Sequence, residues 1–279
     1  MTASDSRPLL GEAGLLSIDD GDIYVCQGGV ADGPVLLLIH GSASSTRSWD
    51  ALVPLLVGSH RVIRVDLLGH GRSAKPVDAS YTVPEQAHRV GAVLDRLGVD
   101  RVVVVGHSSG GVVATALASQ RPELVAGLVL IGTGPGLDAF IAPQTEPLGL
   151  SSWPPSDEQL RRFAGTAFSR AGYRIPSEIL DDVRRMSPHT LAAAMQGTLD
   201  YLARQALPER LTPLGKPLLV LFGEEDRRWR PSSAADYRVV PGAKVELLAG
   251  LGHSPILEDP PRTAVPLLAF AALHSVRMD

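Results

Sequence analysis

The chain has 279 residues, of which 44% are hydrophobic and 20% charged, as in an ordinary globular protein. Its formal charge of −4 and isoelectric point near 6.1 argue against a nucleic-acid partner, which would require a basic face. The single cysteine, Cys26, excludes an intrachain disulfide and lacks the glycine-rich turn of a catalytic thiol. No stretch approaches the roughly 20 apolar residues that span a bilayer, and Met1–Gly14 does not resemble a signal peptide. We therefore expect a cytoplasmic protein without a membrane partner.

The first predicted elements are two strands joined by a tight turn. Leu15–Ile18 and Ile23–Cys26 flank Asp19-Asp20-Gly21, a sequence typical of a hairpin turn. Six strand-like runs follow. The first four are unbroken runs of Val, Leu and Ile typical of strands buried on both faces of a parallel sheet, and the last two complete an eight-stranded sheet. These runs are Pro34–Ile39, Arg61–Val65, Arg101–Val105, Gly127–Ile131, Pro217–Phe222 and Lys244–Leu248.

Amphipathic segments alternate with these strands. They are Trp49–Val57, Val83–Leu97, Ser109–Ser119, Ser232–Val239 and Thr263–His274. Because strands and helices alternate along the chain, the pattern predicts a mostly parallel, eight-stranded sheet flanked by helices.

The pattern changes between residues 134 and 213, where the strand-like runs stop and prolines accumulate. Helical patterns occupy Asp157–Ala171, Ser177–Met186 and Thr190–Arg204. We interpret 134–213 as a helical cap inserted into an α/β core formed by 1–133 and 214–279. Most of its large apolar side chains are expected to pack internally and a minority to face a pocket. These side chains include Trp153, Phe163, Phe168, Met186, Met195, Leu199 and Tyr201.

A serine flanked by glycines follows the strand that ends at Val105, in the sequence Gly106-His107-Ser108-Ser109-Gly110-Gly111. A turn this tight lifts the hydroxyl above the strand ends and aims a helix N-terminus at the place where an oxyanion would form. The bare pattern also occurs in turns that bind nothing, but the strand before it and the helix after it favour a nucleophile. A phosphate loop is disfavoured because no Gly-Lys-Ser/Thr follows.

A second signal, His40-Gly41-Ser42-Ala43, directly follows the strand Val35–Ile39. Acyl transfer requires two backbone N–H groups that stabilise a tetrahedral oxyanion. One comes from the residue after the nucleophile, here Ser109, and the other from the loop after an earlier strand. We predict an oxyanion hole formed by Ser42 and Ser109.

Three further motifs complete the pattern. Asp66-Leu67-Leu68-Gly69-His70-Gly71-Arg72-Ser73, Gly223-Glu224-Glu225-Asp226 and Gly252-His253-Ser254 follow other strands. With the two motifs above, they resemble the α/β-hydrolase superfamily in order and spacing from about residue 20 to 260. Together they are specific for the fold and weakly specific for substrate.

The resemblance implies a triad in which His253 serves Ser108 as base and Asp226 orients the histidine. Asp226 emerges at the carboxyl edge of the sheet, where such folds bind ligands, and His253 lies in a glycine-containing loop after the last strand. The acid stays open to three other carboxylates, namely Glu224, Glu225 and Asp138. Asp66 and Arg72 are expected to tie their loop through hydrogen bonds rather than to catalyse.

The predicted function is a serine hydrolase that cleaves a small, mainly apolar ester, lactone or thioester through an acyl-enzyme on Ser108. A C–C bond hydrolase or a cofactor-free perhydrolase on the same triad is an alternative. A non-hydrolytic isomerase or cyclase, or a ligand-binding protein, is an alternative from another class. We expect a small-molecule substrate, no cofactor, no metal, and a monomer or homodimer, since no His/Cys/Asp cluster has ligand spacing.

Overall fold

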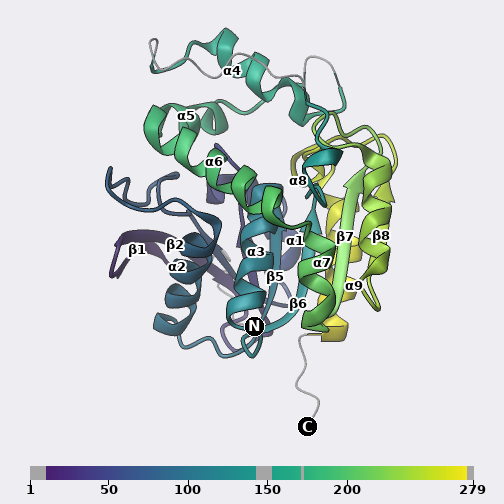
Figure 1. Ribbon diagram of the computed structural model, residues 1–279. Helices are drawn as coiled ribbons and strands as arrows, with labels where there is room; N and C mark the ends of the chain where they lie inside the picture. Colours follow the sequence, from purple (N-terminus) through teal and green to yellow (C-terminus); the bar gives the residue numbers. More distant parts are fainter. Residues whose placement is uncertain (1–10, 143–152, 171–172, 275–279) are drawn as a thin grey trace, which may run out of the picture.

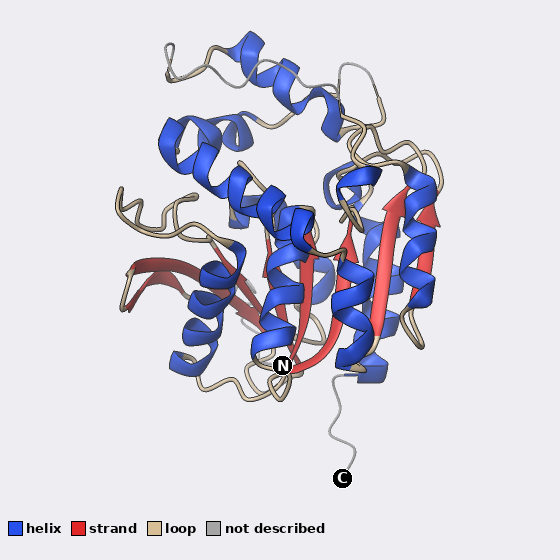
Figure 2. Cartoon of the chain, viewed as in Figure 1, coloured by secondary structure: helices blue, strands red, loops and turns tan. Residues whose placement is uncertain are grey.

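A computed structural model of the chain describes residues 11–142, 153–170 and 173–274. A single sheet lies between helices on its two faces, and a further group of helices crosses above the sheet (Figures 1 and 2). The predicted helix end at Ala171 and the segment before Gly11 lie outside the described residues.

The sheet has eight strands in the order β1-β2-β4-β3-β5-β6-β7-β8. β1 and β2 form the predicted hairpin at one edge, β2 runs antiparallel to β4, and the remaining pairs are parallel. The strands are β1 (Ala13–Ile18), β2 (Gly21–Gly29), β3 (Val35–Ile39), β4 (Arg61–Val65), β5 (Val102–His107), β6 (Val125–Ile131), β7 (Leu218–Gly223) and β8 (Lys244–Leu248). The predicted α/β-hydrolase fold with a mostly parallel, eight-stranded sheet is therefore confirmed.

Side chains of the central strands alternate between two apolar layers. In β3, Leu37 and Ile39 join one buried cluster, whereas Leu36 and Leu38 join the other. Side chains of successive residues in a strand point to opposite faces of the sheet, so each apolar layer covers one face. The central strands are therefore shielded from water on both faces. This is why the central strands appear in the sequence as unbroken apolar runs.

Helices cover each layer. The first layer packs under α2 (Val83–Arg96), α3 (Ser109–Gln120), α7 (Leu207–Leu211) and the 3₁₀ segment η6 (Pro231–Val239). The second packs under η1 (Thr46–Trp49), α1 (Val53–Leu56), α8 (Pro255–Glu258) and α9 (Pro260–His274).

Several helices differ from their predicted extents. The predicted helix over Trp49–Val57 divides into η1 and α1, and Ser232–Val239 is a 3₁₀ helix rather than an α-helix. A proline lies in the first turn of both α1 and η6. Because proline has no backbone N–H and a fixed φ, it is tolerated at the start of a helix and not in its interior, so each helix begins close to its proline. The short helix α7 has too few residues to show a helical period, and the sequence did not predict it.

The segment between β6 and β7 is helical and contains no strand among its described residues. After η2 (Leu137–Ala139) it forms α4 (Asp157–Ala164), η4 (Gly165–Ala167), α5 (Ser177–Arg185) and α6 (Pro188–Arg204). Ser156 and Gln159 form a capping box that starts α4, and the Ser187 hydroxyl caps α6. A third apolar cluster holds α4, α5 and α6 together through Leu160, Leu180, Val183, Met186 and Leu191.

The parallel register brings the carboxyl ends of six neighbouring strands to one edge of the sheet. Ile39 of β3 lies beside Gly106 of β5, and Gly223 of β7 lies beside Leu248 of β8. The loops that carry the predicted site residues therefore meet above this edge, beneath α4, α5 and α6 (Figure 1). Within the described part of the chain, no helix combines the length and apolarity needed to cross a membrane.

Candidate active site

Ser108 lies at the junction of β5 and α3 with φ 54° and ψ −124°. A non-glycine residue with positive φ costs of the order of 1–3 kcal/mol and persists only where its surroundings hold it. Here the Ser108 amide donates to the Ile131 carbonyl at 2.8 Å, and the Gly111 amide donates to the Ser108 carbonyl at 2.9 Å. The strained turn is therefore fixed from both sides.

Two glycines allow this turn to form because their backbones touch other backbone atoms. A Cβ on Gly106 would lie 2.5 Å from the Gly110 carbonyl carbon, and a Cβ on Gly110 would lie 2.2 Å from the Ile39 carbonyl oxygen. No side chain fits at such distances. The glycine pattern in the sequence thus reflects the close contact between α3, β5 and the end of β3.

The three predicted triad residues lie in hydrogen-bonding contact. The Ser108 Oγ is 3.0 Å from Nε2 of His253, and Nδ1 of His253 is 2.9 Å from Oδ2 of Asp226. The side chains of His253 and Asp226 are fully buried. Because an ionised carboxylate only accepts hydrogen bonds, it fixes the proton on Nδ1 and leaves Nε2 free to accept from the serine hydroxyl.

Asp226 is held by more than the histidine. Its Oδ1 accepts hydrogen bonds from the backbone amides of Arg228 at 2.7 Å and Trp229 at 3.1 Å. Burial alone would raise the pKa of this carboxyl, but His253 and the two amides outweigh burial and lower it below its ordinary value. The carboxylate is therefore ionised at neutral pH.

The other carboxylates that the sequence left open lie elsewhere. Glu224 and Glu225 are exposed to solvent. Asp138 is 79% exposed and lies 3.7 Å from Arg230. Among the described residues, Asp226 is the only carboxylate that accepts a hydrogen bond from His253.

The two predicted oxyanion-hole residues also lie together. The Ser42 Oγ donates to the Ser109 Oγ at 2.9 Å, across 67 residues of sequence. In the described chain, neither the Ser42 amide nor the Ser109 amide donates to another protein group. Both amides are thus available to a ligand beside Ser108.

Asp66 and Arg72 have the predicted structural role. The Asp66 carboxylate accepts from the amides of Thr46 at 2.6 Å and Arg72 at 2.8 Å. The side chain of Arg72 donates to the Tyr24 hydroxyl at 2.6 Å and lies over its ring. Asp66 therefore joins the loop after β4 to the start of η1.

Three buried histidines surround the site and are neutral. Burial lowers the pKa of His40 to about 4 and the pKa values of His70 and His107 to about 3. The ring of His40 uses both nitrogens, because Nδ1 contacts the Gly41 carbonyl at 2.8 Å and Nε2 accepts from the Leu67 amide at 3.0 Å. A protonated ring would lose the second bond.

We expect the free energy of unfolding to fall as the pH drops below about 6.5. An unfolded chain protonates these histidines near pH 6.5, whereas the folded chain does not protonate them until about pH 3 to 4. Each should therefore contribute a loss of about 1.4 kcal/mol between pH 7.5 and 5.5. Urea unfolding at these two pH values measures the loss. His70→Gln should reduce it and the exposed His88→Gln should not, and equal stability at both pH values would contradict the prediction.

Several contacts near the site were not predicted from sequence. The Thr133 hydroxyl donates to the Ser108 carbonyl at 3.1 Å, and the Tyr237 hydroxyl donates to the Thr133 carbonyl at 3.0 Å. The Ser45 hydroxyl contacts the carboxylate of Asp182 on α5. These contacts join residues 25 to 137 positions apart, and no local pattern in the sequence marks them.

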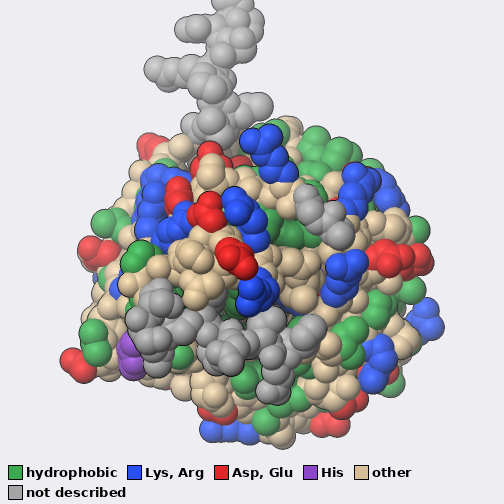
Figure 3. Space-filling model, turned by 90° about the horizontal axis from the view of Figure 1, so that it is seen from above, with side chains coloured by type: hydrophobic (Ala, Val, Ile, Leu, Met, Phe, Trp, Pro, Cys, Tyr) green, Lys and Arg blue, Asp and Glu red, His purple; other side chains and the backbone are tan. Residues whose placement is uncertain are grey.

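A cavity of about 910 Å³ opens between α4 and α5, with Phe168 and Leu180 in its lining. Its lining includes Arg161, Arg170, Arg174 and Arg184 together with Asp157 and Glu178. Acidic and basic side chains alternate across this face of the molecule (Figure 3). The lining is more charged than the sequence pattern suggested, and it includes none of the three triad residues.

Known proteins resemble this chain over most of its length. A family model described as alpha/beta hydrolase fold matches residues 34–260. A pimeloyl-[acyl-carrier protein] methyl ester esterase from Aeromonas hydrophila is 30% identical, covering 82% of this chain and 91% of the relative. A 2-hydroxymuconate semialdehyde hydrolase from Pseudomonas sp. is 33% identical, covering 69% of this chain and 70% of the relative.

Solved structures show the same resemblance. Est816, described as an N-acyl homoserine lactone degrading enzyme, matches with a TM-score of 0.73 and 27% identity, covering 92% of this chain and 100% of that chain. The strand order, the family model and these relatives agree with one another. The chain therefore belongs to the α/β-hydrolase family and is a hydrolase.

Proposed function

We propose that this enzyme cleaves a small, mainly apolar ester, lactone or thioester through an acyl-enzyme on Ser108. The observation that carries the proposal is the continuous chain of contacts from the Ser108 hydroxyl through His253 to the buried, ionised Asp226. A hydroxyl–imidazole–carboxylate chain of this geometry, with a half-buried serine and a fully buried imidazole and carboxylate, suits nucleophilic catalysis.

In the first half-reaction, Ser108 Oγ attacks the substrate carbonyl and its proton passes to Nε2 of His253. Asp226 keeps the imidazole oriented and stabilises the imidazolium without taking the proton. The amides of Ser42 and Ser109 donate to the oxyanion, and each is expected to contribute about 3 kcal/mol to transition-state stabilisation. His253 then protonates the leaving alcohol or thiol, and the acyl group stays on Ser108.

In the second half-reaction, His253 takes a proton from water as the water attacks the acyl-enzyme carbonyl. A second oxyanion forms beside the same two amides, and its collapse releases the acid. The proton on His253 returns to Ser108 Oγ, which restores the starting state. No other reactant is required.

We propose that the helical segment at 134–213 is a cap that selects the substrate. Its contacts with the loops of the proposed triad support this, since the Arg228 side chain donates to Thr166 and to the Phe163 carbonyl, and Glu258 accepts from Ser169. We further propose that a mainly apolar substrate contacts apolar side chains that stay exposed on α6 and after η2. These side chains are Phe140, Ile141, Met195 and Leu199.

A C–C bond hydrolase is the second candidate, supported by the similarity to 2-hydroxymuconate semialdehyde hydrolase. It would use the same residues on a vinylogous diketone. Perhydrolysis on the same triad, non-hydrolytic chemistry and ligand binding in the pocket are further alternatives.

A fluorophosphonate probe and a substrate panel test the proposal. We expect the probe to label Ser108, detected by peptide mass spectrometry, and p-nitrophenyl esters of short acids to turn over faster than vinylogous diketones. Faster turnover of the diketones would favour C–C cleavage instead. Tight ligand binding with neither labelling nor turnover would contradict hydrolysis and favour a binding protein.

A further inference from the structure

Helix α5 carries a buried carboxylate that the proposed mechanism does not use. The side chain of Asp182 is 3% exposed, on the same helix as the buried Leu180 and Val183. Burial raises the pKa of this carboxyl above its ordinary value. A carboxylate is costly to bury and is kept inside a protein only where specific partners satisfy it.

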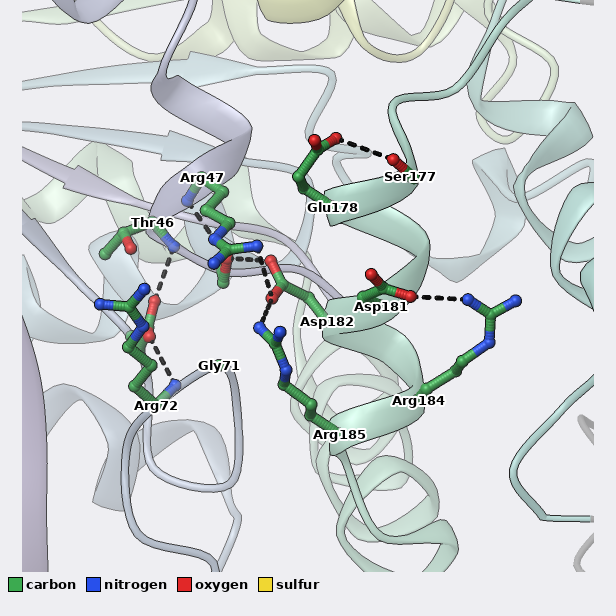
Figure 4. Close-up of polar contacts among 12 residues, drawn as sticks. Thr46, Arg47, Gly71, Arg72, Ser177, Glu178, Asp181, Asp182, Arg184 and Arg185 are labelled. Atoms are coloured by element: carbon green, nitrogen blue, oxygen red, sulfur yellow. Dashed lines mark hydrogen bonds and ion pairs between the residues drawn. The ribbon is translucent and has the colours of Figure 1, made fainter.

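The partners of Asp182 come from both sides of the boundary between the helical segment and the core. Arg185 of the same helix lies 3.2 Å from Oδ1, and Arg47 of η1 lies 4.0 Å away. The Ser45 hydroxyl donates to Oδ2. Figure 4 shows Asp182 pointing from α5 toward Arg47, whereas its neighbour Asp181 points away toward Arg184.

The geometry at Ser45 leaves only one direction for its hydroxyl proton. Its Oγ accepts from the Arg47 amide at 3.1 Å, which caps η1. The carboxylate of Asp182 can only accept, so the Ser45 proton points to it. The hydroxyl is thus held between the helix start and α5.

Ser45 lies three residues after Ser42, whose amide is a proposed oxyanion donor. Between them, Ala43 has φ 55°, a left-handed conformation that is unfavourable for alanine. The Ala43 side chain belongs to the same apolar cluster as Leu180 and Val183 of α5. The strained turn after Ser42 therefore shares an apolar cluster with α5 through Ala43 and contacts α5 directly through Ser45.

The core holds the other side of this loop. The Asp66 carboxylate accepts from the Thr46 amide at 2.6 Å, directly next to Ser45. Two buried carboxylates, Asp66 from the core and Asp182 from α5, thus accept hydrogen bonds from the adjacent residues Thr46 and Ser45 of one loop. Fixing adjacent residues in this way restricts the backbone direction at Ser42.

We propose that Asp182 is a positioning residue that, through the Ser45 hydroxyl, holds the loop of Ser42 in the conformation that stabilises the oxyanion. The predicted effect of Asp182 on the reaction rate rests on the proposed function. The predicted effect of Asp182 on the conformation of the Ser42 loop does not. This positioning role makes α5 part of the machinery for turnover as well as for substrate selection.

The kinetic test is a double-mutant cycle on a short p-nitrophenyl ester. Removing one oxyanion donor lowers kcat by about 10²–10³-fold, so loosening one should lower kcat about 10- to 100-fold with little change in KM. We expect this result for Asp182→Ala and for Ser45→Ala. The double variant should lose no more than Ser45→Ala alone, because the bond between the two side chains is then already absent and the cap on the Arg47 amide is lost with Ser45 in both cases. Asp182→Asn keeps an acceptor for the hydroxyl and should recover most of kcat.

The matched control is Asp181→Ala on the same helix, whose side chain is 46% exposed and pairs with Arg184. It should leave kcat unchanged. Additive losses in the cycle, or a kcat for folded Asp182→Ala equal to that of the wild type, would overturn the proposal. Circular dichroism identifies any variant that has lost its fold. If Asp182→Ala does not fold, Ser45→Ala still tests whether the hydrogen bond between the two side chains supports kcat.

Hydrogen–deuterium exchange tests the loop without relying on catalysis. Peptides covering residues 41–48 should exchange faster in Asp182→Ala and Ser45→Ala than in the wild type or Asp181→Ala. Unchanged exchange would overturn the positioning role even in an active enzyme. If the wild type hydrolyses no ester and Ser108 resists the fluorophosphonate, the proposed function fails, while the exchange result still decides whether Asp182 holds the loop.

Discussion

Replacing Ser108 with alanine should lower kcat for ester hydrolysis by about 10⁴- to 10⁶-fold. The substitution removes the only hydroxyl that contacts His253 Nε2 among the described residues, so no acyl-enzyme can form. Alanine keeps the Cβ and the strained backbone of the turn. The free energy of unfolding should therefore change by about 1 kcal/mol or less, the usual contribution of one hydrogen bond.

Steady-state kinetics with p-nitrophenyl acetate and a urea titration measure the two quantities on the same sample. Ser119→Ala, near the other end of α3, is the matched control and should keep wild-type activity, since its hydroxyl donates to the Thr115 carbonyl and to no other group in the described part of the chain. Undiminished turnover by a folded Ser108→Ala variant would end the case for nucleophilic catalysis by this serine.

Replacing Asp226 with asparagine should lower kcat by about 10⁴-fold. The amides of Arg228 and Trp229 both donate to Oδ1, so the side-chain oxygen of an asparagine would stay toward them and its NH₂ would face Nδ1 of His253. The imidazole would then accept at Nδ1 and carry its proton on Nε2. In that tautomer it cannot take the proton of Ser108.

The measurement is kcat at neutral pH, accompanied by fluorophosphonate labelling. Labelling should slow together with turnover, because both require removal of the serine proton. Glu225→Gln is the control, since this neighbouring carboxylate is exposed, and it should behave as the wild type. If Asp226→Asn retained more than a tenth of kcat while Glu225→Gln lost activity, the acid would have to be reassigned.

The strands were predictable because burial on two faces leaves a simple mark in sequence. Every strand from β3 to β7 falls on a predicted apolar run, and the predicted strand Lys244–Leu248 is β8, an edge strand whose side chains are mostly exposed. Helix ends were less predictable, since they depend on prolines, caps and tertiary packing. The division of Trp49–Val57 into η1 and α1 follows from the Ser45 cap and from Pro54, neither of which changes the apolar pattern.

At the site, glycine spacing located Ser108 because the backbone contacts at Gly106 and Gly110 allow no other residue. The choice of carboxylate was harder, since Glu225 and Asp226 are adjacent in sequence and differ mainly in direction. Burial and two backbone amides distinguish Asp226, and these contacts exist only after the loop has folded. For the same reason, no local pattern could reveal the contact between Ser45 and Asp182, 137 residues apart.

The sequence separations within the triad have a consequence for folding. The contact between Ser108 and His253 spans 145 residues, and the last strand, β8, lies at the edge of the sheet immediately before the histidine loop. Closing so long a loop is entropically slow, and contacts of this kind form late. We therefore expect a chain that has not yet completed the β8 edge of the sheet to hydrolyse no ester, so that enzymatic rate reports completion of the whole topology.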